Sequence, residues 1–372
     1  ITGSKKDRAI VQAHDIGLEF FTDMNQQIAI KVWVGGGLGR TPILGSVIKE
    51  KLSWKHILTY CEAILRVYNL YGRRDNMYKA RIKILVKALG IDKFRDLVEK
   101  EWEFIKDGPN TINNSELNRV KAFFTEPHYI KDTKNDLESH IQDKSFSQWL
   151  SRCTQSHKKK HYRSVTLSLK SNHQAPGDAT SEQMQYVADL ADEYSFGEIR
   201  VSHEQNLILA DVHEDNLYEL WNKAKNLHLA TPNIGLITDI ICCPGGDFCS
   251  LANAKSIPIA DSIQQVFDDM DYLHDIGDID LNISGCMNAC GHHHVGHIGI
   301  LGVDKDGSEW YQVTLGGNQG NFANIGKVIG PSFSADEMPA VIRKIVDTYV
   351  KERHSDETFI DCVIRVGLEP FK

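Results

Sequence analysis

The sequence contains no apolar run of the length that a membrane span requires. It also has no excess of positive charge, because 42 Lys and Arg residues stand against 50 Asp and Glu residues and give a net charge of −8. A negative balance disfavours non-specific binding to nucleic acid. No Gly-x-Gly-x-x-Gly run follows a strand-like segment, so the fingerprint of a flavin or nicotinamide site is missing. We therefore expect neither a membrane nor a nucleic acid as a partner.

Cysteines are few, and half of them show no pairing pattern. Of the 8 cysteines, the scattered ones are Cys61, Cys153, Cys242 and Cys362. A secreted disulfide framework usually shows dense, regularly spaced cysteines, whereas a reducing cytoplasm favours cysteines as ligands. No secretory signal is visible, and we expect a cytoplasmic protein.

The remaining four cysteines form two short runs, Cys243-x5-Cys249 and Cys286-x3-Cys290. Four thiolates in two close pairs, far apart in sequence, suit a cubane iron–sulfur cluster. A loop around a cluster also needs backbone freedom and close N–H groups, which glycine supplies. The flanking glycines are Gly245, Gly246, Gly285 and Gly291. The pattern predicts that the four cysteines bind a [4Fe–4S] cluster.

Three other interpretations of these cysteines stay open at this point. Zinc is a rival because four histidines follow the second run, although structural zinc favours Cys-x2–4-Cys spacing. These histidines are His292, His293, His294 and His297. Burial for packing alone and disulfide formation are the other two interpretations. With a cluster present, we expect the histidines to pack and hydrogen-bond on its side.

Longer segments around the cysteines carry a resemblance to a known family. Ser-Gly-Cys-Met-Asn-Ala-Cys-Gly surrounds the second run, His-His-His-Val-Gly-His-Ile-Gly-Ile-Leu-Gly spans 292–302, and Leu-Gly-Gly-Asn spans 315–318. With Cys-x5-Cys, they resemble sirohaem-containing sulfite and nitrite reductases, most of all the bacterial single-subunit haemoproteins, over essentially the whole chain. The resemblance implies that the four cysteines hold a [4Fe–4S] cluster. It also implies a sirohaem, whose iron is bridged to the cluster by the thiolate of Cys290.

The sequence repeats itself at a nearly constant offset. Residues 1–4 match 283–286 at an offset of 282, and residues 34–39 match 315–320 at an offset of 281. The second register runs on without a gap, which chance glycine matches do not do. The repeat predicts a duplicated fold. Together with the resemblance it implies an α+β fold of duplicated sirohaem/iron–sulfur reductase domains related by a pseudo-twofold axis.

The second copy begins near His161, so a complete first copy would need roughly 120 residues before Ile1. We therefore expect the chain to lack the N-terminal part of a longer protein and to be inactive as a fragment. Four parts are expected. They are the rear of the first copy, without a cluster, at 1–100, a helical connecting segment at 101–160, a ferredoxin-like half-domain at 161–232, and the second copy with the cluster site at 233–372.

Local patterns predict the elements of these parts. Residues 162–232 suit the order β-α-β-β-α, a ferredoxin-like split unit. Its expected pieces are a strand at 165–169, a helix at 179–192, a hairpin at 198–209 turning at 203–206, and a helix at 215–227. In the first copy we expect a strand at 28–34 and helices at 54–71 and 77–89.

Sirohaem carries many carboxylates, so its pocket needs cationic groups and backbone N–H donors. Two recurring glycine loops are predicted to form anion-binding nests, one at Gly35, Gly36 and Gly37 and the other at Gly316, Gly317 and Asn318. The residues suggest Arg40 and Arg200 as further contacts. The resemblance implies that Gln205, Asn206 and Asn318 lie by the macrocycle.

The first copy has lost its cysteines. Ser4 and Arg8 stand at the positions of Cys286 and Cys290, so this copy cannot hold its own cluster. We expect Arg8 to face the carboxylates of the cofactor. One departure from the family is Met77, which stands where the resemblance implies a basic residue.

The predicted function is that of an assimilatory sulfite reductase haemoprotein. It would reduce sulfite to sulfide with six electrons at the sirohaem iron, coupled to the cluster through Cys290. Nitrite reduction to ammonia and a zinc-stabilised binding module are the alternatives. The substrate would be a small inorganic anion, and electrons would come from a separate flavoprotein or ferredoxin. The resemblance implies that most of the basic groups around the substrate lie in the missing part.

Overall fold

The computed structural model describes residues 1–133, 137–172 and 174–372. The chain forms two compact units. The first comprises Ile1–Glu126 and Asn318–Ile325, and the second comprises Pro127–Gly317 and Gly326–Lys372. None of the helices in the described ranges combines the length and the apolar character needed to cross a membrane.

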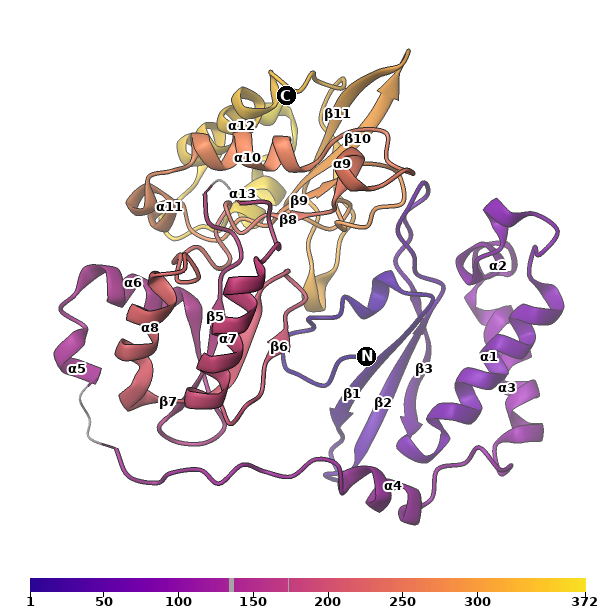
Figure 1. The fold of residues 1–372 in the computed structure, drawn as a ribbon. Helices are drawn as coiled ribbons and strands as arrows, with labels where there is room; N and C mark the ends of the chain where they lie inside the picture. The colour runs from indigo at the N-terminus through magenta and orange to yellow at the C-terminus, as the bar shows by residue number, and fades with distance from the viewer. Residues whose placement is uncertain (134–136, 173) are drawn as a thin grey trace. The chain divides into compact units, whose positions relative to one another are not determined.

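The first unit is an antiparallel sheet in the order β1-β2-β3, with helices against one face (Figure 1). Alternate residues of β2 are buried against these helices, as expected for a sheet covered on one side. The elements are β1 (Ile16–Thr22), β2 (Ile28–Val34), β3 (Ser46–Ser53), α1 (Ile57–Tyr71), α2 (Ile82–Leu89), α3 (Ile91–Ile105) and α4 (Asn114–Lys121). Short 3₁₀ turns lie at Val11–Ala13, Trp54–His56, Met77–Lys79 and Gly320–Phe322.

The N-terminal part of the second unit contains an antiparallel sheet in the order β4-β5-β7-β6. Its core includes Trp149, Leu190 and Trp221 from the helices beside it. The helix α7 starts at a capping box, in which Thr180 and Gln183 bond each other's backbone. The elements are α5 (Leu137–His140), α6 (Lys144–Cys153), β4 (Thr154–Ser156), β5 (Tyr162–Leu167), α7 (Ser181–Tyr194), β6 (Arg200–Val201), β7 (Leu207–His213) and α8 (Leu217–Lys225).

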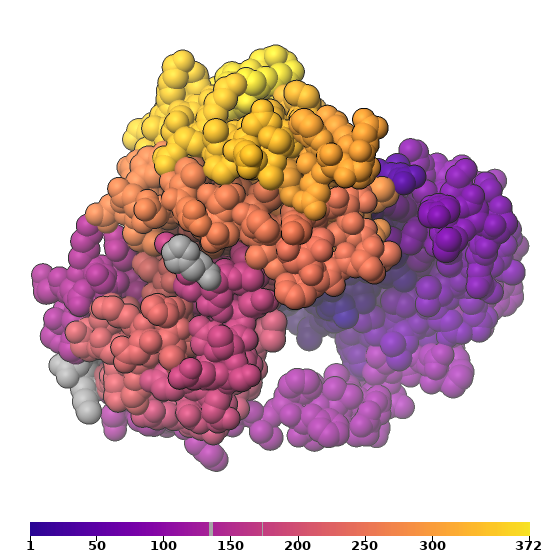
Figure 2. Space-filling view, turned by 45° about the horizontal axis from the view of Figure 1, so that its top comes forward, coloured from indigo at the N-terminus to yellow at the C-terminus, as the bar shows by residue number. Residues whose placement is uncertain are grey.

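The C-terminal part of the second unit contains a mixed sheet in the order β12-β11-β10-β9-β8. The strands β8, β9 and β10 run parallel, and β10, β11 and β12 run antiparallel. The elements are β8 (Ile241–Cys242), α9 (Gly245–Phe248), α10 (Ile257–Val266), α11 (Met270–Ile276), β9 (Leu281–Ser284), β10 (Ile298–Lys305), β11 (Ser308–Leu315), β12 (Lys327–Val328), α12 (Met338–Glu352) and α13 (Phe359–Val366). In Figure 2 the atoms of the yellow C-terminal residues adjoin those of the orange segment that precedes them in the chain.

The predicted duplication is visible in the backbone of the two copies. Ile16 lies opposite Val34 in the first copy, and Ile298 lies opposite Leu315 in the second. The helices α1 and α12, each of 15 residues, follow at the same offset. Three loop hydrogen bonds also recur. The donors Gly35, Gly37 and Gly45 bond the carbonyls of Asp15, Ile43 and Gln12, and the donors Gly316, Asn318 and Gly326 bond those of His297, Asn324 and His294.

The predicted elements match the structure well, with one clear correction. The strand at 28–34, the helix ending at Tyr71 and the β-α-β-β-α order of the half-domain are all present. The helix expected at 77–89 is broken, because Asn76 caps a 3₁₀ turn and Arg81 is extended and pairs with Asp15. Part of the expected connecting segment, residues 134–136, lies outside the described residues.

Candidate metal centre

The two cysteine runs start at the carboxyl ends of neighbouring parallel strands. The first run begins directly after β8, and the second begins two residues after β9. The N–H of Cys243 donates to the Ile283 carbonyl at 3.1 Å, and the N–H of Gly285 donates to Cys243 Sγ at 3.1 Å. Parallel neighbours end at the same edge of a sheet, so runs about forty residues apart meet there.

Glycines let the two loops approach each other. A Cβ on Gly285 would lie 2.6 Å from the Ala254 carbonyl oxygen and 2.8 Å from Gly245 Cα. Gly245 itself has φ +56°, and a Cβ there would lie 2.5 Å from the Ser256 backbone nitrogen. A side chain at either position would therefore separate the cysteine loops. Ser256, which no sequence pattern singles out, also places its hydroxyl 3.6 Å from Cys243 Sγ.

The four thiols are neighbours at this edge. Burial raises the pKa of the Cys290 thiol, and the nearby thiols of Cys243, Cys286 and Cys249 raise it further. Cys286 is buried, Cys290 is exposed, and all four are free thiols. Nowhere in the described ranges do three or more His, Cys, Asp or Glu side chains form a group that could hold a metal ion as they stand.

The histidines after the second cysteine run differ in their burial and in their hydrogen bonds. His293 is fully buried, and neither of its ring nitrogens has a hydrogen-bond partner among the described residues. Burial is the main cause that lowers its pKa to about 3, and the rings of His293 and His294 lie 3.9 Å apart. His297 instead accepts a hydrogen bond at Nδ1 from the Asp280 N–H. The expectation of hydrogen bonding therefore does not hold for His293, which packs as a neutral ring.

Three of the expected sirohaem contacts lie on or beside the β6–β7 hairpin, and all have protein partners. Arg200 pairs with Glu198 on the surface. Asn206 is 1% exposed and bonds the Leu169 N–H and the Asp239 carboxylate. Gln205 bonds the backbone of Cys242 through both ends of its amide. The amides of Gln205 and Asn206 thus bond to the protein, and their place beside the macrocycle, which the resemblance implies, stays a prediction.

The two glycine loops, which were expected to form anion-binding nests, hydrogen-bond to the backbone of the protein itself. The N–H groups of Gly35, Gly36 and Gly37 donate to the carbonyls of Asp15, His14 and Ile43. In the second copy, the N–H groups of Gly316 and Asn318 also donate to backbone carbonyls. These N–H groups therefore have partners within the protein, and the part of the two loops in binding an anion stays a prediction. A Cβ on Gly36 or Gly317 would lie 2.1 or 2.3 Å from a backbone carbonyl oxygen, so the glycines serve close packing.

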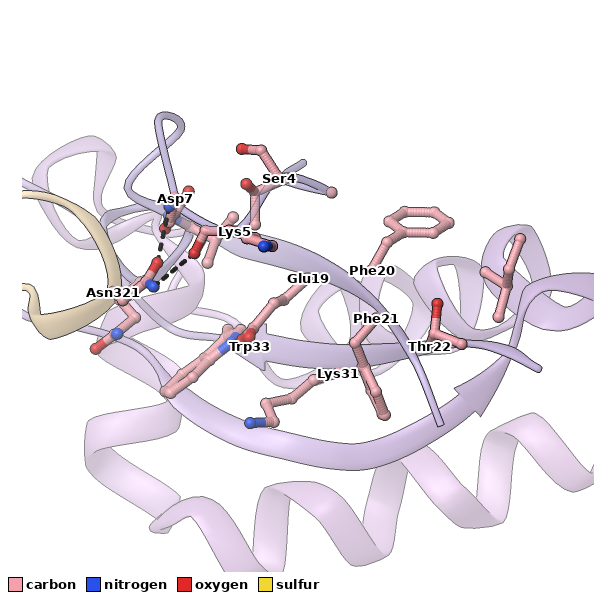
Figure 3. Close-up of a pocket in the computed structure, with 15 residues that line it drawn as sticks. Ser4, Lys5, Asp7, Glu19, Phe20, Phe21, Thr22, Lys31, Trp33 and Asn321 are labelled. Carbon is pink, nitrogen blue, oxygen red and sulfur yellow. Dashed lines mark hydrogen bonds between the residues drawn. The ribbon is translucent and has the colours of Figure 1, made fainter. Parts of the chain in front are cut away.

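The remaining expected contacts lie in the first unit. Arg8 and Arg40 are exposed, and Ser4 lines a cavity of about 710 Å³ on the open face of β1 and β2. Figure 3 shows Glu19, Lys31 and Trp33 on this face, and Trp33 Nε1 donates to Glu19 at 3.1 Å. The loop that begins at Asn318 contributes Asn321 to the lining of this cavity. Its residue Asn321 donates to the Lys5 carbonyl and accepts the Asp7 N–H, both at 2.8 Å (Figure 3).

Comparison with known proteins identifies the family of this fold and cysteine arrangement. Residues 1–106 and 236–372 match the "Nitrite and sulphite reductase 4Fe-4S domain", and residues 155–227 match the "Nitrite/Sulfite reductase ferredoxin-like half domain". The chain belongs to the nitrite and sulphite reductase 4Fe-4S domain family. A [4Fe–4S] cluster and sirohaem, the two expected cofactors, are those of this family.

Several curated relatives are similar over nearly the whole chain. Sulfite reductase [ferredoxin] 1 of Mycolicibacterium paratuberculosis is 25% identical over 97% of this chain and 60% of its own length. The assimilatory ferredoxin-dependent nitrite reductase of Haloferax mediterranei is 27% identical over 99% of this chain and 60% of its own length. The chain thus spans about 60% of the length of these relatives.

A solved structure has the same fold. The Mycobacterium tuberculosis NirA protein superposes with a TM-score of 0.74 at 24% identity, over 98% of this chain and 62% of that chain. This agreement supports the expected α+β architecture with its duplicated domains and ferredoxin-like half-domain.

Proposed function

We propose that this chain is the cofactor-binding part of a sulfite reductase haemoprotein, which reduces sulfite to sulfide with six electrons. Membership of the family supports the reductase class. Relatives named as ferredoxin-dependent sulfite reductases support sulfite as the substrate. The observation that carries the proposal is the meeting of two cysteine runs at one edge of the β8–β9–β10 sheet.

The cysteine side chains fit a [4Fe–4S] cluster. Four free thiols, Cys243, Cys249, Cys286 and Cys290, come from two loops that glycines allow to approach each other. A cubane cluster takes one thiolate at each of its irons, so its ligands need not converge on one point as the ligands of zinc do. The N–H of Gly285 donates to Cys243 Sγ, the kind of hydrogen bond that tunes cluster potentials. We assign the four residues as the cluster ligands.

Cys290 is the proposed link to sirohaem. It is the most exposed of the four cysteines, so its sulfur is open to a second partner. When bound, sirohaem would supply the iron at which the anion is reduced. Arg8, Arg40 and Arg200 stay as predicted contacts to its carboxylates, since all three are exposed cations. For Gly35, Gly36, Gly37, Gly316, Gly317 and Asn318 we propose a role in shaping the loops around the cofactor.

The electron donor is proposed to be a ferredoxin. The names of relatives such as the ferredoxin-dependent enzymes favour it. A separate flavoprotein is the alternative, because another relative is the haemoprotein component of an NADPH sulfite reductase. The proposed setting is the cytoplasm, where cysteines serve as ligands rather than bridges.

Nitrite is the second candidate substrate, and one observation favours it. Nitrite reductases of Haloferax mediterranei and Synechococcus elongatus are as similar to this chain, at 27% and 25% identity, as the sulfite reductases are. The test is anaerobic purification of the full-length protein, followed by iron and sulfide analysis, a visible spectrum, and turnover with each anion under a chemical reductant. Cluster iron, a sirohaem spectrum and higher kcat/KM for sulfite are expected. A colourless protein that contains zinc would overturn the proposal.

A further inference from the structure

One side chain closes the outer edge of the five-stranded sheet beside the cysteine loops. β8 is the outermost strand, and its inner side pairs with β9. On the other side, Gln205 Nε2 donates to the Cys242 carbonyl at 2.8 Å, and the Cys242 N–H donates to Gln205 Oε1 at 2.8 Å. An amide that donates to and accepts from one residue replaces the hydrogen bonds of a neighbouring strand.

The backbone at Gln205 is shaped for this contact. Gln205 has φ +57°, in the left-handed region that residues other than glycine adopt only when the surroundings hold them there. Gly177 lies beside it, and a Cβ at that position would be 2.9 Å from Gln205 Cβ. The absence of a side chain on Gly177 therefore leaves the space that Gln205 uses.

A buried ion pair fixes the residues on both sides of Gln205. Lys170 Nζ donates to the Glu204 carbonyl at 2.8 Å and to Asp239 Oδ1 at 3.0 Å. The side chains of Lys170 and Asp239 are 0% and 4% exposed. On the other side, Asn206 Nδ2 donates to the same Asp239 oxygen at 3.0 Å. Buried charges persist where they are paired and fully hydrogen-bonded, so this network is a rigid support.

The residue that Gln205 bonds, Cys242, is the direct neighbour in sequence of a proposed cluster ligand. Cys242 is followed by Cys243, whose N–H bonds Ile283 and whose sulfur accepts the Gly285 N–H. The resemblance to reductases implies that Gln205 lies by the macrocycle. In the structure its amide hydrogen-bonds to β8, the strand that leads into the first cysteine loop. We propose that Gln205 is a positioning residue that holds Cys242 and thereby Cys243, and that the Lys170–Asp239 pair holds Gln205 in place.

This inference rests on the proposed function only in taking Cys243 as a cluster ligand. Its test uses the full-length protein and two readouts. The first is hydrogen exchange at the Cys242 amide, which needs no cofactor, and the second is the electron paramagnetic resonance spectrum of the reduced cluster. In Gln205→Met, the loss of the acceptor should raise exchange at Cys242 about five- to tenfold and shift the cluster signal. The matched control is Gln185→Met, which removes an exposed glutamine of α7.

The ion pair is tested by Lys170→Met, against Lys223→Met, which removes a surface ion pair on α8. Lys170→Met should raise exchange at Cys242 as Gln205→Met does, whereas Lys223→Met should not. If Lys170→Met does not fold, the double variant Lys170→Met/Asp239→Asn removes the unpaired buried charge and is measured instead. Unchanged Cys242 exchange in Gln205→Met would overturn the inference. A full-length protein without iron would overturn the proposed function and leave the exchange test valid.

Discussion

At the scale of single residues, two adjacent cysteines have opposite environments. Cys242 is 3% exposed within the core of the five-stranded sheet, and burial raises the pKa of its thiol. Cys243 is half-buried, and its sulfur accepts an N–H from the other cysteine loop. A buried neutral thiol packs as a small apolar group, whereas a thiolate at a loop edge can bind metal. The two positions therefore form a matched pair for mutation.

We expect Cys243→Ser to lose most of the cluster from the full-length protein, because one iron would lack its thiolate. Cys242→Ala should keep it and lose only a little stability, through a small cavity. Iron and acid-labile sulfide per chain, measured after anaerobic purification, check this pair. Equal loss of iron in both variants would show that Cys243 is not a specific ligand.

A second residue-scale prediction concerns Glu357, between α12 and α13. Arg365 donates to its carboxylate at 2.7 and 2.6 Å, the His354 N–H donates at 3.0 Å, and together they lower its pKa to about 2. Because the pKa in the folded state lies below the ordinary value of 4.5, its contribution to stability is complete above about pH 4.5. The contribution is lost as pH falls through about 2.

Glu357→Gln should therefore lower the urea midpoint of unfolding at pH 7, and the difference from wild type should shrink between pH 4.5 and 2. Urea titrations at pH 7, 4 and 3 measure this. A difference that stays constant over these pH values would contradict the assigned role of the carboxylate.

At the scale of elements, the corresponding strands β1 and β10 of the two copies need a glycine at the same place. A Cβ on Gly17 of β1 would lie 2.2 Å from the Val11 carbonyl oxygen, and a Cβ on Gly299 of β10 would lie 1.9 Å from that of His293. Backbone atoms cannot move aside as the end of a side chain can. The glycine matches in the sequence thus mark places where a preceding turn crosses the strand.

We expect Gly17→Ala and Gly299→Ala each to cost more than about 2 kcal/mol of unfolding free energy, because the loop must move off the strand. Gly307→Ala is the control, since nothing lies within 4 Å and only φ +81° is unfavourable. It should cost about 1 kcal/mol. Urea unfolding of the three variants gives the comparison, and a Gly299→Ala protein as stable as Gly307→Ala would refute the close approach.

At the scale of the whole molecule, one fold is used twice with different chemistry. Both copies keep the sheet register, the glycine loops and the following helices. Only the second unit contains the cysteine runs, while the first has Ser4 and Arg8 at the matching positions. Stabilisation by a cluster should therefore be confined to the unit whose side chains bind it.

Removal of the cluster iron from the whole protein should accordingly raise hydrogen exchange at 241–254 and 281–300. Exchange in β1, β2 and β3 should change little, because the proposed ligands are not in that unit. Mass spectrometry of peptic peptides before and after treatment with chelator and oxidant measures both regions. Equal loss of protection in β1–β3 would contradict the assignment of the cysteines as the only cluster ligands.

The sequence by itself determined the duplicated α+β fold, the order of elements in the half-domain and the family, because periodicity, glycine positions and cysteine spacing are local patterns. Only the tertiary structure decided which partners the polar groups take. Gln205 and Cys242 are 37 residues apart, and no sequence pattern around either residue indicates that they hydrogen-bond to each other. The N–H groups of Gly35, Gly36 and Gly37 look free in a sequence, yet the fold supplies carbonyls for them. Hydrogen-bond partners distant in sequence are set by packing, so a motif identifies a loop without revealing what its atoms bind.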